Sequence, residues 1–140
     1  MKFIGKLLSK NSYNEKKSTA VSIGTLGEEA AVKALIKKGY KIIERNYRSK
    51  TGEIDIIAKD GDYTCFVEVR LRKNNEFGSP AETIGEAKCR RIINTAKIYA
   101  VSKHIYDSPM RFDVVLINAQ AGAKGLKNIH LEIIKDAFRL

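Results

Sequence analysis

Two acidic residues interrupt apolar runs near the middle of the chain. Asp55 and Glu68 lie inside β-branched segments of the stretch Gly52–Arg72, and the basic Arg70 follows Glu68 by two positions. A carboxylate in the middle of a sheet loses hydration, which is costly unless another group compensates it. A bound cation is one candidate for that group. These three side chains are therefore the first candidates for chemistry in the chain.

The dipeptide Asp60-Gly61 separates the two apolar runs and predicts a β-hairpin, because Gly supplies a positive φ without steric cost. A two-residue loop there gives a register whose expected pairs are Lys59 with Asp62, Asp55 with Phe66, and Glu53 with Glu68. Side chains alternate between the two faces of a strand. One face is therefore expected to carry Glu53, Asp55, Phe66, Glu68 and Arg70. The other is expected to be an apolar core face made of Ile54, Ile56, Cys65, Val67, Val69 and Leu71.

The acids and Arg70 suit the chemistry of phosphodiester hydrolysis. Two carboxylates and a strand carbonyl supply hard oxygen ligands for Mg²⁺. A metal in such a site lowers the pKa of a bound water and offsets charge on the scissile phosphate. An arginine on the same face can clamp the phosphate. Asp55 with Glu68-Val69-Arg70 resembles the PD-(D/E)-x-K motif of the restriction-endonuclease-like superfamily.

Length and charge narrow the class of protein. A chain of 140 residues is enough for one domain with a core and too short for two ordinary ones. The net charge of +10 favours an anionic partner, either nucleic acid or an acidic membrane surface, although solubility alone is the alternative. No apolar run is long enough to span a membrane, so we expect no stable insertion. Cys65 and Cys89 fit no metal-binding spacing, and reduced thiols in a cytoplasmic protein are expected.

Residues 1–22 carry five lysines against the single acid Glu15. We expect a mobile basic segment that precedes one domain at residues 23–140. The alternative is a short amphipathic helix that touches a membrane or a partner protein through residues 1–10. Its apolar side would be made of Phe3, Ile4, Leu7 and Leu8.

The remaining pattern predicts an α/β fold. Helices are expected at Ile23–Lys38 and, after the capping box Ser79-Pro80-Ala81-Glu82 and a break at Gly85, up to about Ser102. Besides the hairpin, strands are expected at Tyr40–Asn46, Arg111–Asn118 and, at an edge, Ile129–Ile134. Connecting segments are expected at Tyr47–Lys50, Lys73–Gly78 and Ala119–Asn128, with a terminal turn at Lys135–Leu140. This order predicts a central mixed sheet flanked by helices.

Two helical features leave alternatives open. Glu28 and Glu29 both lie near the start of the first helix, where acids suit the helix dipole. Each shares a ridge with apolar residues, so periodicity does not decide which one faces the sheet. On the second helix, Lys88, Arg90 and Arg91 lie on or beside the outer face, together with Lys97. Charged faces are usually only solvated, but a face of one sign favours contact with phosphates.

An ordered series of residues resembles the YraN family of bacterial proteins over about residues 23–138. The series is Gly24, Gly27-Glu28, Ala31, Gly39-Tyr40, Arg45-Asn46, Gly52-Glu53-Ile54-Asp55, Phe66-Val67-Glu68-Val69-Arg70, Ser79-Pro80, Lys88, Arg111-Phe112-Asp113-Val114-Val115 and Ala137-Phe138. That family looks distantly similar to archaeal Holliday junction resolvases. The resemblance implies a restriction-endonuclease-like fold and a metal-dependent DNA endonuclease, perhaps acting on branched DNA. It also selects Glu28, because a resolvase-like first helix has its acid eleven residues before the Gly that is Gly39 here.

The hypothesis that follows assigns a role to each candidate. Asp55 and Glu68 bind Mg²⁺ or Mn²⁺, Glu28 orients a metal-bound water, and Arg70 stabilises charge on the phosphate. Nucleic-acid contacts are expected from Arg48, Lys50, Arg72, Lys88, Arg90 and Arg91. By similarity to the resolvases we expect a homodimer. The alternative hypothesis is a nuclease fold that binds nucleic acid without cutting it, because an arginine stands where the superfamily has lysine and cannot act as a base.

Overall fold

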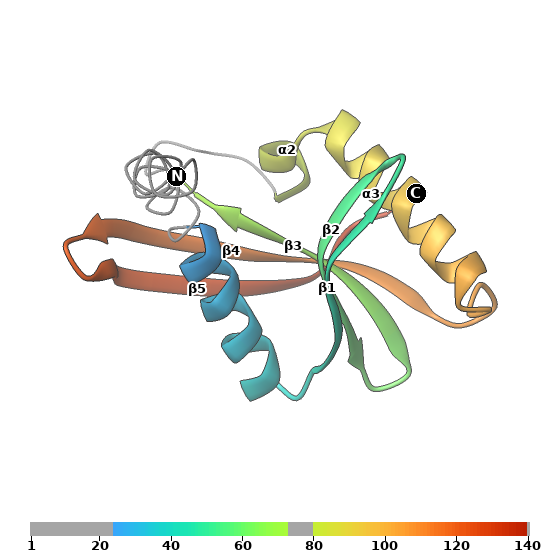
Figure 1. Ribbon diagram of the computed structural model, residues 1–140, viewed down its shortest axis with the longest axis horizontal. Helices are drawn as coiled ribbons and strands as arrows, with labels where there is room; N and C mark the ends of the chain where they lie inside the picture. Colours follow the sequence, from blue (N-terminus) through green and yellow to red (C-terminus); the bar gives the residue numbers. More distant parts are fainter. Residues whose placement is uncertain (1–23, 73–79, 140) are drawn as a thin grey trace, which may run out of the picture.

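The computed structural model describes residues 24–72 and 80–139. After a helix over residues 24–37, the elements are β1 (Lys41–Ser49), β2 (Gly52–Asp60), β3 (Tyr63–Leu71), α2 (Pro80–Ile84), α3 (Glu86–Ser102), β4 (Met110–Gly122) and β5 (Gly125–Phe138) (Figure 1). The predictions for residues 1–23, for the loop 73–78 and for Ser79 as the cap of the next helix lie outside the described residues. Within the described ranges, no helix is long and apolar enough to cross a membrane.

The five strands form one mixed sheet in the order β1-β2-β3-β4-β5. β3 and β4 are parallel, and the other neighbouring pairs are antiparallel. A parallel pair needs a crossover connection, and the segment with α2 and α3 provides it. The predicted α/β class, with a central mixed sheet and helices beside it, is confirmed.

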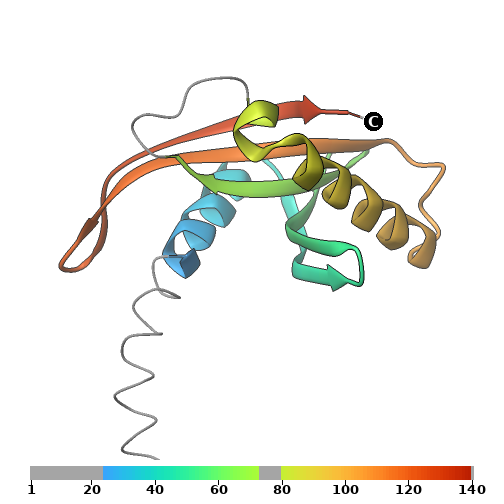
Figure 2. The ribbon, with the colours of Figure 1, turned by 90° about the horizontal axis from the view of Figure 1, so that it is seen from above.

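Each face of the sheet carries a hydrophobic core over its central strands. One core lies between the sheet and α2 and α3, and its buried members include Ile57, Phe66, Ile92, Ile93, Ala96, Tyr99, Val114 and Leu116. The other lies under the N-terminal helix and includes Ala31, Leu35, Ile56, Ala58, Cys65, Val67, Val115 and Ile117. Because side chains alternate along β3, Phe66 packs towards α3 while its neighbours pack towards the N-terminal helix. Figures 1 and 2 show the N-terminal helix and α3 beside the central strands.

The predicted hairpin between β2 and β3 exists, but its predicted register was wrong. Asp60 pairs with Tyr63, and Phe66 pairs with Ile57 instead of Asp55. The two loop residues are therefore Gly61, with φ of +59°, and Asp62. The physical reason lies outside the hairpin, because ion pairs to β4 and β5 hold the Asp60 carboxylate within the strand.

The predicted separation into a core face and a charged face was only partly correct, since Ile56, Cys65 and Val67 do share one core with Val69 packed against it. Phe66, expected beside the acids, is fully buried against α3, so both faces of the hairpin enter a core. Ile54 and Ile56 pack in different cores although they are two residues apart. The β2–β3 ladder ends at Ile56, beyond which β2 bends away from β3. Leu71, expected in the core, is 40% exposed.

The bent tip of the β1–β2 hairpin is fastened to α3 (Figure 1). The hydroxyls of Thr51 and Thr95 are 2.7 Å apart, and the hydroxyls of Ser49 and Thr51 are 2.9 Å apart. Thr95 is fully buried. Tyr47 packs edge-on against Tyr99, with ring centroids 5.1 Å apart. These contacts fix the strand segment that carries Glu53 and Asp55.

β4 and β5 form a longer hairpin than predicted. The segment 119–128, expected as a loop, continues both strands up to the pair Gly122 and Gly125. The segment 135–138, expected as a turn, belongs to β5. The edge position expected for the last strand is confirmed. Most side chains from residue 123 to residue 130 are exposed. Because exposed strand positions can be polar, the composition of segment 119–128 resembled that of a loop.

A buried polar network links the strands at the end of the sheet away from the β1–β2 tip. Asp113, with no exposed surface, accepts hydrogen bonds from the Tyr40 hydroxyl at 2.8 Å and from the Asp136 backbone N–H at 2.9 Å. The Arg111 guanidinium donates to Asp113 at 2.8 Å and to Asp60 at 2.7 Å. The network therefore connects β2, β4, β5 and the start of β1.

Candidate functional site

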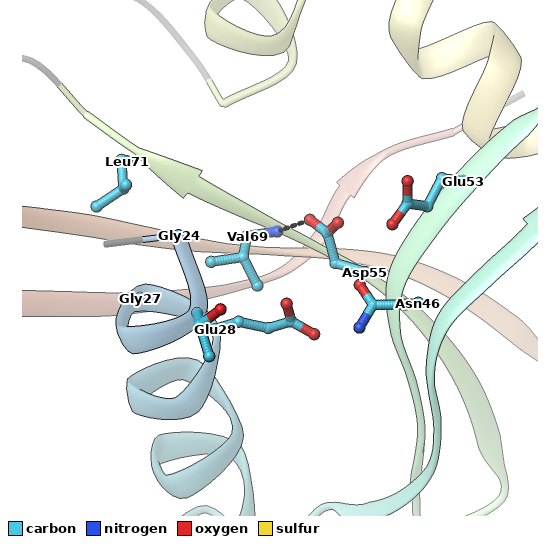
Figure 3. A pocket seen from close by; sticks show the side chains of 9 residues that line it. Gly24, Gly27, Glu28, Asn46, Glu53, Asp55, Val69 and Leu71 are labelled. Atoms are coloured by element: carbon cyan, nitrogen blue, oxygen red, sulfur yellow. Dashed lines mark hydrogen bonds between the residues drawn. The ribbon is translucent and has the colours of Figure 1, made fainter. Parts of the chain in front are cut away.

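An open pocket of about 330 Å³ lies between the start of the N-terminal helix and strands β1, β2 and β3. Figure 3 shows the side chains that line it, which belong to Gly24, Thr25, Gly27, Glu28, Asn46, Glu53, Asp55, Val69 and Leu71. Three carboxylates thus line one pocket, one from the helix and two from β2.

Asp55 is the carboxylate whose ionisation is most perturbed at this site. Its Oδ2 accepts a hydrogen bond from the backbone N–H of Val69 at 2.9 Å (Figure 3). Burial and the negative charge of Glu68 raise the pKa of Asp55 to about 7, against smaller lowering effects of the Val69 N–H and Lys88. A carboxyl that titrates near neutral pH beside a second acid can accept either a proton or a cation.

Glu68 lies next to Asp55 but does not line the pocket. Glu68 is only 4% exposed, and its Oε1 is 2.7 Å from the Nζ of Lys88 on α3. Its charge nevertheless acts on Asp55 strongly enough to raise the pKa of that group. The two acids predicted from the sequence therefore come together from neighbouring strands, one at the pocket wall and one paired with α3.

The structure separates the two acids that helical periodicity left undecided. Glu28 lines the pocket, and Figure 3 shows its carboxylate directed towards Asp55 and Asn46. Glu29 does not line it, and its side chain is 45% exposed. Arg45 contacts both, with its Nε 3.4 Å from Glu28 and its Nη1 2.7 Å from Glu29. Glu28 is thus the acid that faces the sheet, in agreement with the prediction.

The predicted basic residues fall into separate groups. Arg48, Lys50, Arg90 and Arg91 are exposed, whereas Arg70 and Arg72 are half-buried on or just after β3. Arg70 does not line the pocket. The backbone of Gly52 approaches Arg91 and Thr95 closely, which places the basic β1–β2 turn beside α3. Lys88, predicted on or beside the outer helix face, instead directs its ammonium to Glu68.

Asn46 is a site residue that sequence reasoning did not identify. It lines the pocket, and its neighbours on β1 pair with Ile56 and Ile54, on either side of Asp55. Its φ is +54°, a conformation that non-glycine residues avoid and that asparagine tolerates best. Such strain concentrates at functional sites. In the sequence, the only sign of this residue was an asparagine within a segment predicted as a strand. The alternation of apolar and polar residues gives such an asparagine no function.

The acids fit a metal that requires few protein ligands. Among residues 24–72 and 80–139, no three acidic, histidine or cysteine side chains gather as a ready-made metal cage. Mg²⁺ commonly uses one or two carboxylates and keeps several waters. Asp55 and Glu68 provide that number of hard oxygen donors, and a cation between them would relieve the repulsion that raises the pKa of Asp55.

Fold and site together define an α/β protein with a five-stranded mixed sheet, compatible with a nuclease-like fold. The chain belongs to the uncharacterised protein family UPF0102, whose model matches residues 27–117. This is the YraN family that the sequence resembles, so the predicted membership is confirmed.

Relatives in this family are similar over most of their length. The UPF0102 protein of Clostridium kluyveri is 42% identical over 120 residues, which cover 84% of this chain and 94% of the relative. That of Clostridium perfringens strain 13 is 44% identical over 119 residues, covering 85% and 95%. That of Hahella chejuensis is 41% identical over 119 residues, covering 85% and 91%. Because the family is uncharacterised, the chemistry of the site is the basis for a functional conclusion.

Proposed function

We propose that the protein is a metal-dependent endonuclease that hydrolyses phosphodiester bonds in DNA. The observation that supports this most is the pair Asp55 and Glu68. Asp55 is a desolvated carboxylate, and the charge of Glu68 raises its pKa. Asp55 lies at the wall of a pocket that Glu28 also lines. Carboxylates near bound DNA repel its phosphates, so this arrangement suits a nucleic-acid site only if a cation joins them.

In this proposal the residues of the chain have distinct tasks. Asp55 and Glu68 would hold Mg²⁺ or Mn²⁺, and such an ion would lower the pKa of a bound water and offset phosphate charge. Glu28 accepts a hydrogen bond from the attacking water and orients it. Arg70 donates to the phosphate, and its guanidinium stabilises charge without exchanging a proton. The Val69 N–H keeps the Asp55 carboxylate in place.

The decisive experiment is a cleavage assay on linear, flap and four-way-junction DNA with Mg²⁺, Mn²⁺ or chelator. We expect cleavage only with metal, and none from Asp55→Ala or Glu68→Ala. Asp62→Ala, at the exposed turn of the same hairpin, is the matched control and should cut like the wild type. Cutting that persists in chelator, or that survives Glu68→Ala, would contradict the proposal.

Binding of DNA is tested separately in chelator. Arg90 and Arg91 are exposed on α3 near the basic β1–β2 turn. Their joint replacement by alanine should weaken DNA binding and reduce the slope of log affinity against log salt by up to about two charges. Asp55→Ala should bind DNA at least as well as the wild type, because it removes a negative charge. An unchanged salt slope would assign the two arginines to solubility.

The second candidate is a nucleic-acid-binding module that does not cut. Arg70 in place of a lysine favours it, because a guanidinium cannot accept a proton. The wild type would then leave every substrate intact with either metal, and Arg70→Lys would be the variant to confer some cutting. If the protein is an enzyme, Arg70→Lys should retain or raise activity, and Arg70→Ala should lose about a hundredfold.

We further propose that the protein acts as a homodimer, because cutting two strands of a branched substrate requires two sites. Light scattering with and without junction DNA tests this. A monomer in both conditions would restrict the proposal to cleavage of one strand at a time.

A further inference from the structure

Lys88 is placed differently from the other basic residues on α3. It lies in the first turn of the helix, and its ammonium is 2.7 Å from the Oε1 of Glu68, a residue that is only 4% exposed. Its positive charge also reaches Asp55. The side chain of Lys88 is itself 42% exposed. One end of the contact is therefore fixed in the protein, while the other can move towards solvent.

The simplest role for Lys88 is that of a counter-ion. A buried carboxylate without a partner is strongly destabilising, and Lys88 removes that cost for Glu68. This role changes, however, if Glu68 binds a cation. A divalent ion at Glu68 would supply the positive charge that Lys88 supplies in its absence, and the ammonium would then be repelled. An anion for the displaced ammonium would then be the phosphate drawn to that ion.

We propose that Lys88 is a catalytic residue, whose ammonium leaves Glu68 and binds a non-bridging oxygen of the scissile phosphate. The proposal rests on the proposed nuclease function. In the hydrolysis, the oxygen of water bonds to phosphorus and the bond from phosphorus to one ester oxygen breaks. Solvent takes the water proton and protonates the leaving oxygen. Lys88 keeps its protons throughout and stabilises the negative charge that accumulates on the phosphoryl oxygens.

The test compares Lys88→Met with Lys103→Met, which removes the same charge from an exposed position after the last turn of α3. Three quantities are measured for each variant: Mn²⁺ affinity by calorimetry without DNA, DNA affinity in chelator, and the cleavage rate at saturating DNA. We expect Lys88→Met to bind Mn²⁺ at least as tightly as the wild type, because a competing cation has gone. Its DNA affinity should stay within about threefold, and its cleavage rate should fall about a hundredfold or more. Lys103→Met should match the wild type in all three.

Two results would overturn the assignment of Lys88 while leaving the nuclease proposal intact. One is Lys88→Met cutting at the wild-type rate. The other is a loss of cleavage that is fully explained by a parallel loss of Mn²⁺ binding, which would make Lys88 a counter-ion only. A wild type that cuts no substrate overturns both proposals.

Folding is checked first, because Lys88→Met leaves Glu68 without its cation. If that variant does not fold, Lys88→Gln replaces it, since the Gln amide still donates a hydrogen bond to Glu68 without a charge. The same loss of cleavage at unchanged Mn²⁺ affinity is then expected. Wild-type cleavage by Lys88→Gln would contradict the assignment.

Discussion

Among the single residues, Asp55 has an ionisation that couples folding to pH near neutrality. Its carboxyl has a pKa near 7 in the folded protein and near 4 in the unfolded chain, so the folded state holds an extra proton between these values. The folded state is therefore favoured by this group at low pH, and the advantage is lost as pH rises from about 4 to about 7. Above pH 7 the folded protein carries an unfavourable charge unless a cation binds.

Replacement of Asp55 by asparagine should therefore stabilise the metal-free protein at alkaline pH. The amide oxygen can still accept from the Val69 N–H, and no charge remains. We expect Asp55→Asn to exceed the wild type by about 2 kcal/mol in the free energy of unfolding at pH 8, and by little at pH 4. Urea unfolding in chelator at the two pH values measures this. A difference that does not depend on pH would contradict the account.

Substitutions at Asn46 measure the cost of the backbone strain at the pocket. Because φ is +54°, glycine should fit the backbone better than alanine. We expect Asn46→Ala to be less stable than Asn46→Gly by about 1 kcal/mol, measured by urea unfolding. If the amide serves the site, both variants should lose cleavage equally. Equal stability of the two variants would mean that the strand relaxes at this position.

The chemistry of single residues was predictable where it depended on residue type. Acids in apolar runs are conspicuous, so Asp55 and Glu68 could be found without a structure. Asn46 could not be found, because a positive φ within a strand leaves no periodic signal. The contact of Lys88 with Glu68 was also out of reach, because it depends on how α3 lies on the sheet.

At the scale of elements, the β1–β2 tip depends on its hydrogen bonds to α3. Thr95→Val keeps the shape of the side chain but removes the hydroxyl that meets Thr51 at 2.7 Å. We expect a loss of about 1–2 kcal/mol in the free energy of unfolding, because buried polar groups lose a partner. Thr95→Ser, which keeps the hydroxyl, is the control. If valine is tolerated as well as serine, packing alone holds the tip.

The register error shows why local signals were not enough for the elements. The Asp60-Gly61 pair is a strong turn signal, yet Asp60 stays in β2 because Arg111 and Lys135 hold it there. Those partners are 51 and 75 residues away. The β4–β5 extension escaped prediction for a related reason, since strands beyond the core need no apolar alternation.

At the scale of the whole molecule, the Arg111 network connects strands that are distant in sequence. Arg111→Met should cost about 3–5 kcal/mol, because it leaves the charge of the buried Asp113 uncompensated. Arg139→Met is the control, since its ion pair with Asp136 lies at the surface and should change stability by less than about 1 kcal/mol. Chemical denaturation at pH 7 compares them. Similar small losses in both would show that Asp113 is adequately compensated by Tyr40 and the Asp136 N–H.

The layered architecture was the most predictable feature at this scale. The order of helices and strands alone implies a mixed sheet between helices, because each apolar face must be covered. The pattern did not reveal that the strands β2 and β3 are buried on both sides. That follows from α3 returning over the face on which Phe66 lies, which is a long-range event.

The two cysteines report on the two layers separately. Cys65 lies in the core under the N-terminal helix, and Cys89 lies in the core under α3. Burial raises the pKa of Cys65 to about 12 and also raises that of Cys89, so both thiols resist alkylation while the protein is closed. Alkylation rates of variants that retain one cysteine each would therefore time the opening of each face. Equal rates would mean that both helices leave the sheet in one step, whereas faster labelling at one cysteine would identify the layer that opens first.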